Sequence, residues 1–107
     1  MGSNMKLTIK DRVFIPGILP TEGGRFEMIA VRDLMSKIEF SSAELEEYGI
    51  RPTDKGVTWE SNFEKEIEFS NSEKGIILDA LAKADKGGKL PLEFISTWEK
   101  LYKYLQQ

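Results

Sequence analysis

Histidine and cysteine are both absent from this chain of 107 residues. Their absence removes the side chain that most often transfers protons near neutral pH, the thiolate nucleophile, and the two ligands that dominate zinc and most redox-metal sites. A disulfide framework is excluded as well. The sequence therefore argues against an enzyme, and it predicts no catalytic residue, no metal site and no cofactor.

Long apolar runs are also lacking. No stretch approaches the roughly 20 residues that a membrane-spanning helix needs, and no apolar signal segment follows the second methionine, Met5. We therefore expect a cytoplasmic protein without membrane contact. Residues 1–4 are interpreted as an expression-tag remnant, which leaves residues 5–107 as a single globular domain.

An excess of basic residues is missing too. The chain has 15 Lys and Arg against 18 Asp and Glu, a net charge of −3, which argues against broad electrostatic binding to nucleic acid. Its hydrophobic content of 40% and charged content of 31% are typical of a folded soluble domain.

What the chain does have is a series of helix signals. Thr8–Asp11, Ser41–Glu44 and Ser70–Glu73 each have the spacing of a capping box, in which an N-cap hydroxyl and an acidic residue three positions later satisfy each other's backbone N–H groups. With apolar residues recurring at helical spacing, these signals predict five helices. They span residues 8–19, 25–40 and 42–48, a segment between Ser70 and Gly87, and a last segment that begins at Pro91.

A strand is the alternative for the first of these segments, because Leu7, Ile9, Val13 and Ile15 share one parity. It would point Asp11 into the core, which counts against it.

Two short segments alternate in the manner of strands. Residues 57–60 and 66–69 are predicted to form a two-stranded antiparallel hairpin connected through residues 61–65. Its buried face would carry Val57, Trp59, Ile67 and Phe69. The predicted fold is therefore a mostly helical α+β domain, with about five helices around one core and the hairpin between the third and fourth helices.

The acidic residues show no sign of a reaction centre. They cluster at 44–47 and on the predicted hairpin, on faces opposite the apolar residues, which is typical of a solvated surface. The segment 83–94 has the length of a calcium loop between helices, but it lacks oxygen ligands at Gly87 and Phe94, where a hard cation needs them. We expect the carboxylates to face water.

The bulky aromatic residues are the candidates for a binding surface, because such residues dominate interface hot spots. Phe63 at the hairpin tip and Tyr104 off the main stripe of the last helix are the stronger candidates. Trp59 and Trp98 complete the candidate interface, although the helical spacing of Trp98 favours a place in the core.

Three helices followed by a hairpin is also the element order of a winged-helix domain, so a nucleic-acid-binding regulator is the alternative function. The element in the recognition position, residues 42–48, carries three glutamates and no basic residue, which would repel phosphates. Such a regulator would need a basic face assembled from Lys6, Lys10, Arg12, Arg25, Arg32 and Lys37.

Taken together, residues 6–20, the Val31-Arg32-Asp33-Leu34 segment, the Val57-Thr58-Trp59 strand and the closing helix pair resemble a group of small phage- and prophage-encoded proteins. These proteins have no agreed activity, so the resemblance implies a phage or prophage origin and assigns no functional residues. We therefore predict a non-enzymatic module that binds a partner protein or assembles with itself.

Overall fold

The computed structural model describes residues 3–54, 56–88 and 90–106, which form a mostly helical α+β fold. Among these residues are five α-helices and two antiparallel pairs of strands. In chain order the elements are β1 (Ser3–Thr8), α1 (Ile9–Ile18), α2 (Arg25–Ile38), α3 (Ser42–Glu47), β2 (Arg51–Thr53), β3 (Gly56–Thr58), β4 (Glu64–Phe69), α4 (Asn71–Lys86), a 3-10 turn (Leu92–Phe94) and α5 (Ile95–Leu105).

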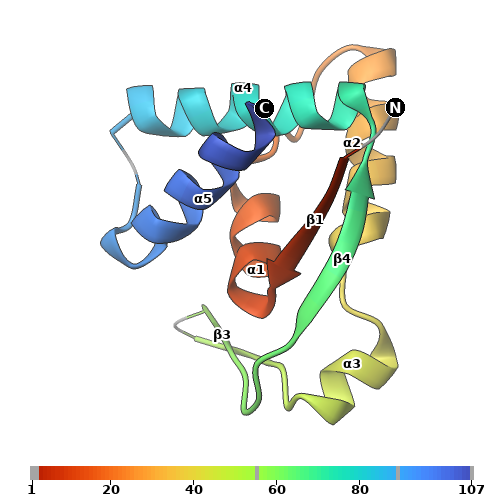
Figure 1. Cartoon of the computed structure of the whole chain (residues 1–107), viewed down its shortest axis with the longest axis vertical. Coiled ribbons are helices and arrows are strands. Elements are labelled where there is room, and N and C mark those ends of the chain that lie inside the picture. Colours follow the sequence, from red (N-terminus) through yellow and green to blue (C-terminus); the bar gives the residue numbers. More distant parts are fainter. Residues whose placement is uncertain (1–2, 55, 89, 107) are drawn as a thin grey trace.

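The predicted fold class is confirmed, and β2 and β3 form the antiparallel hairpin between α3 and α4. The longer sheet of β1 and β4 runs through the middle of the molecule (Figure 1). One end of this sheet lies against α4, whereas α3 and the hairpin lie beyond its other end.

All three predicted capping boxes form. The hydroxyls of Thr8, Ser41 and Ser70 each accept a hydrogen bond from the backbone N–H three residues later, and the acidic side chain at that position bonds back to the N-cap N–H. These three helices therefore begin where local sequence predicts. The last helix was predicted from Pro91, but α5 begins at Ile95, after the 3-10 turn. Pro16 does not end the first helix, which continues to Ile18.

The strand partners differ from those predicted. Residues 64–69 pair with β1 over six residue pairs, from Ser3 opposite Phe69 to Thr8 opposite Glu64. Residues 51–53 form the partner of β3 instead. The chain after β3 turns away because the N–H groups of Glu60 and Ser61 both donate to the carbonyl of Tyr48 at the end of α3.

The strand β1 was not predicted, and it begins inside the segment interpreted as a tag remnant. Ser3 and Asn4 belong to the strand, whereas Met1 and Gly2 lie outside the described residues. The strand alternates as a half-buried strand should: Met5 and Leu7 are buried, and Asn4 and Lys6 are exposed.

One hydrophobic core joins this sheet to four of the helices. It contains Met5 and Leu7 of β1, Ile67 and Phe69 of β4, and the apolar stripes of α1, α2, α4 and α5. The stripes are those that helical spacing predicts, since Leu34, Ile77, Leu81 and Leu101 are fully buried. The helix α3 contributes no buried residue and lies outside this core.

Candidate functional site

Buried charges, which sequence analysis did not predict, hold the helices to one another. Arg12, Asp11 and Glu73 are each at most 3% exposed. The expectation that the carboxylates face water is therefore wrong for Asp11 and Glu73. The reason is common to both: a capping-box carboxylate turns back over its own helix N-terminus, and each of these two is covered further by a lysine from another helix.

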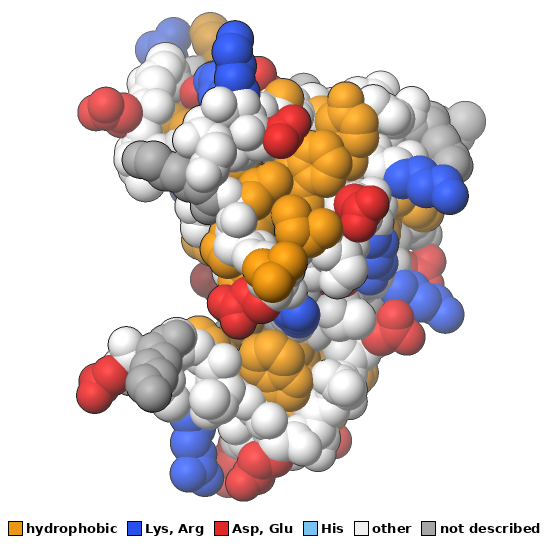
Figure 2. Space-filling view, turned by 90° about the vertical axis from the view of Figure 1, so that its left-hand side faces the viewer, with side chains coloured by type: hydrophobic (Ala, Val, Ile, Leu, Met, Phe, Trp, Pro, Cys, Tyr) orange, Lys and Arg blue, Asp and Glu red, His pale blue; other side chains and the backbone are white. Residues whose placement is uncertain are grey.

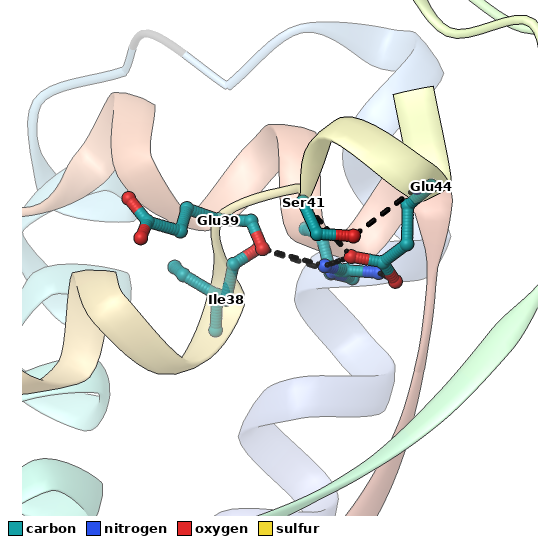
Figure 3. A network of polar contacts seen from close by, with 5 residues as sticks. Ile38, Glu39, Ser41 and Glu44 are labelled. Atoms are coloured by element: carbon teal, nitrogen blue, oxygen red, sulfur yellow. Dashed lines mark hydrogen bonds and ion pairs between the residues drawn. The ribbon is translucent and has the colours of Figure 1, made fainter. Parts of the chain in front are cut away.

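Arg12 links the end of α2 to the beginning of α3. Its guanidinium donates to both carboxylate oxygens of Glu44, at 2.8 and 3.0 Å, and to the carbonyls of Ile38 and Glu39, at 3.0 and 2.7 Å. Figure 3 shows the two carbonyls from the end of α2 on one side and the Ser41–Glu44 capping box of α3 on the other. The guanidinium also stacks 4.3 Å from the centre of the Phe40 ring.

This arrangement strongly favours the ionised form of Glu44. The hydrogen bond from Arg12 is the main reason that the pKa of Glu44 falls from 4.5 to about 2, although partial burial of the carboxylate opposes the shift. The Arg12 side chain is completely buried and the Glu44 side chain is 14% exposed. Because the Arg12 side chain is completely buried and makes four hydrogen bonds, it holds these elements together and is not exposed to a ligand.

The other two capping-box carboxylates each bind a lysine from a distant helix. Asp11 of α1 accepts from Lys100 of α5 at 2.5 Å, and Glu73 of α4 accepts from Lys37 of α2 at 2.6 Å. Burial alone raises the pKa of Glu73, but hydrogen bonds from Lys37 and from Ser70 outweigh it and lower the pKa. Each carboxylate thus caps its own helix and ties it to another.

These buried acids do not converge on one place. Asp11, Glu44 and Glu73 each have a different cationic partner, and no buried polar side-chain atom in the described parts of the chain lacks a hydrogen-bond partner. Over the same residues, no three Asp or Glu side chains are close enough to hold a metal ion. Each of these carboxylates is therefore neutralised by its own cation, as buried charges require.

The four aromatic residues predicted as an interface occupy separate surroundings. Phe63 is half-buried and stacks on Tyr48 with 4.6 Å between ring centres. Trp59 is half-buried and its indole N–H donates to Asn62. Trp98 packs against the core and donates to the carbonyl of Leu81, whereas Tyr104 is 38% exposed and donates to the carbonyl of Asn4.

The six basic residues that a nucleic-acid interface would need are largely engaged elsewhere. Arg12 is buried against Glu44, Lys37 is bound to Glu73, and Arg32 pairs with its neighbour Asp33. The helix in the recognition position, α3, has six residues, among them Glu44, Glu46 and Glu47. Three of the six cations are thus already paired with carboxylates, which lowers the positive charge available to phosphates.

An apolar band extends from the turn before α5 along one side of that helix. We define it by four residues: Leu92, which is 89% exposed, Ile95, which is 36% exposed, and the half-buried Trp98 and Tyr102. The rings of Trp98 and Tyr102 stack with 4.8 Å between centres, and Ile95 lies on the same side of the helix. Figure 2, which faces the side of the molecule with the α4–α5 connection, shows hydrophobic side chains running as a continuous band.

A groove lies on the sheet, between β1, β4 and α5. Its volume is about 590 Å³, and it is lined by Asn4, Met5, Lys6, Glu64, Glu66, Lys100, Lys103 and Tyr104. Of the predicted interface residues, only Tyr104 borders it. Sequence reasoning missed the groove because it arises from the pairing of β1 with β4, which was not predicted.

Comparisons with known proteins do not add a name to these surfaces: no family model, no curated protein and no solved structure matches the chain. None of the described helices has both the length and the hydrophobicity needed to cross a membrane.

Proposed function

We propose that this protein is a non-enzymatic protein-binding module, and that the apolar band of Leu92, Ile95, Trp98 and Tyr102 is its contact surface. The exposure of Leu92 carries the proposal. A leucine side chain that is 89% exposed forgoes about 1.5–3 kcal/mol of burial free energy, which a protein partner can recover.

The composition of the band supports the same conclusion. Aromatic residues are enriched in protein interfaces and charged residues are depleted from interface centres. The indole N–H of Trp98 already donates to the Leu81 carbonyl, so covering the ring leaves no donor unsatisfied. A partner that covers the Trp98 ring therefore gains apolar contact area without burying an unpaired N–H.

We take a second copy of the chain as the partner. A domain of this size buries a modest fraction of its surface when it folds alone, and self-association lets it bury more apolar area. A contact between identical bands would be symmetric, as in most small homodimers.

Light scattering across a range of protein concentrations tests this proposal. We expect the wild-type protein to form a dimer and the Leu92→Glu variant to remain a monomer, because the new carboxylate would be buried at the contact. Leu45→Glu is the matched control: Leu45 is also exposed, at 40%, but lies on α3. A wild-type protein that is monomeric at millimolar concentration, or a dimer that survives Leu92→Glu, would refute the proposal.

A further inference from the structure

The outer edge of β1 presents backbone hydrogen-bonding groups without a neighbouring strand. In an antiparallel ladder, every second residue turns its N–H and C=O away from the partner strand. On β1, the N–H of Thr8 donates to Asp11 at 2.9 Å, which shows that it faces away from β4. The carbonyl of Asn4 accepts from the hydroxyl of Tyr104, which lies outside the sheet.

Lys6 lies midway between these two residues in the same register. Its N–H and C=O therefore also face outward, and within the described ranges of the chain no backbone or side-chain group bonds to them. Lys6 thus offers an added strand one backbone donor and one backbone acceptor, both on the outer edge of β1.

The groove on the sheet adjoins this edge. Asn4, Met5 and Lys6 line it from β1, and Lys100, Lys103 and Tyr104 line it from α5. Its volume of about 590 Å³ is within the range of roughly 300–1,000 Å³ that is typical of ligand sites. An extended segment of a few residues can therefore occupy it beside β1.

The charges of the groove are unequally distributed between its sides. Glu64 and Glu66 belong to β4, whereas Lys6, Lys100 and Lys103 belong to β1 and α5. Lys100 is paired with Asp11, but in the described part of the structure neither Lys6 nor Lys103 has a carboxylate within 4 Å. The side of the groove next to the open edge is therefore complementary to an acidic ligand.

From the open edge and this charge distribution, we infer that an extended, acidic segment of a partner protein adds to β1 as a third strand. Its backbone bonds to the N–H and C=O of Lys6, and a carboxylate side chain reaches Lys103. This is β-strand addition, in which main-chain hydrogen bonds supply affinity and alternate side chains supply specificity. The surface is distinct from the apolar band, so the inference does not depend on the proposed dimer.

A second copy of the chain fits this edge less well. If two β1 strands paired antiparallel through all three outward-facing residues, with Asn4 opposite Thr8, Lys6 of one copy would lie opposite Lys6 of the other, and like charges in that position are destabilising. Lysine on an exposed edge is a common way of preventing such self-pairing.

The test uses three blocked pentapeptides as probes, added to the isotope-labelled full chain and followed by amide chemical shifts. The first is acetyl-Thr-Val-Glu-Val-Thr-amide. The second has Lys in place of Glu, and the third is the first peptide with N-methyl groups on Glu and the preceding Val. Two consecutive N-methyl groups block strand addition in either register, because one of them always replaces an inward-facing donor.

We expect the Glu peptide to shift the amides of Met5 to Thr8 and of Lys103, the Lys peptide to bind at least about tenfold more weakly, and the N-methylated peptide not to bind. In the Lys103→Glu variant the preference between the Glu and Lys peptides should reverse. Lys86→Glu, the same charge change on the exposed end of α4, should leave the preference unchanged.

Three results would overturn the inference: no shift with millimolar Glu peptide, shifts confined to residues away from β1 and α5, or equal binding of the N-methylated peptide. If β1 amides shift with protein concentration in the absence of peptide, the edge pairs with a second copy instead. A monomer that binds the Glu peptide would refute the proposed dimer and leave this inference standing.

Discussion

The two outer edges of the central sheet differ in the side chains that bond to their backbone groups. The edge of β4 is sealed by charge at Glu68: the ammonium group of Lys37 donates to the carbonyl of Glu68 at 2.9 Å and to the buried carboxylate of Glu73 at 2.6 Å. On the edge of β1, the hydroxyl of the 38% exposed Tyr104 donates to the Asn4 carbonyl, and the Thr8 N–H donates to Asp11. Lys6 lies between these two contacts.

The difference shows where this fold depends on polar contacts and where it does not. On the sealed side, the Arg12–Glu44 and Lys37–Glu73 pairs join helices that contribute to the core or cap its corner, and their loss leaves a charge buried. On the open side, water can replace the Tyr104 hydroxyl at little cost. A partner strand that bonds to Lys6 can therefore bind at the β1 edge while the buried Asp11–Lys100 pair and its bond to the Thr8 N–H stay in place.

Lowering the pH should destabilise the fold first through the ion pairs on the sealed side. The pKa of Glu44 is lowered from 4.5 to about 2 in the folded protein, chiefly by the hydrogen bond from Arg12. A lowered pKa stabilises the fold fully above the unfolded value, and this stabilisation is lost as the pH falls from about 4.5 towards 2. The expected loss is on the order of 3 kcal/mol, measurable by urea unfolding at a series of pH values.

Glu44→Gln tests the assignment of this pH dependence. The variant should be less stable at neutral pH, and its stability should change less between pH 5 and pH 2 than that of the wild-type protein, because it lacks the titrating carboxylate. The lowered pKa of Glu73 has the same sign, so some acid sensitivity should remain. An unchanged pH profile would contradict the role given to Glu44.

Opening the β4 edge should have the next largest effect. Lys37→Met removes the donor to the Glu68 carbonyl and leaves the carboxylate of Glu73, whose side chain is 4% exposed, without its cation. We expect the free energy of unfolding to fall by about 2 kcal/mol. The control Lys86→Met, at an exposed position of α4, should change it by less than about 0.5 kcal/mol.

The smallest effect is expected at the β1 edge. Tyr104→Phe removes only the hydroxyl bond to the Asn4 carbonyl, so the free energy of unfolding should fall by about 0.5–1 kcal/mol in denaturant titration. Hydrogen exchange at Met5 and Lys6 should change little. A destabilisation as large as that of Lys37→Met would mean that the two edges are equally closed, which would remove the basis of the comparison.

Local sequence predicted the beginnings of helices well. The capping boxes at Thr8, Ser41 and Ser70 depend on groups three residues apart, and the left-handed Gly49 after α3 depends on its own backbone, with a φ of 62°. The alternation of residues 66–69 likewise identified the face of β4 that is buried, since Ile67 and Phe69 are in the core.

The same reasoning could not assign the partner of β4. An alternating segment pairs with any strand of matching register, and the nearest candidate along the chain was residues 57–60. Its actual partner is β1, about 60 residues away, where Met5 and Leu7 complete the buried face. The groove and the open edge follow from this pairing, so the candidate site was out of reach of sequence patterns apart from Tyr104.

By itself, the sequence determined which segments become helices, which faces are apolar, and which carboxylates cap the helix ends. These properties arise from groups within a few residues of one another. Only the tertiary structure decided which cation meets each capping carboxylate, across 32 residues for Arg12–Glu44, 36 for Lys37–Glu73 and 89 for Lys100–Asp11. Contacts at such separations depend on how the whole core packs, because it is burial of the apolar faces that brings these charges together.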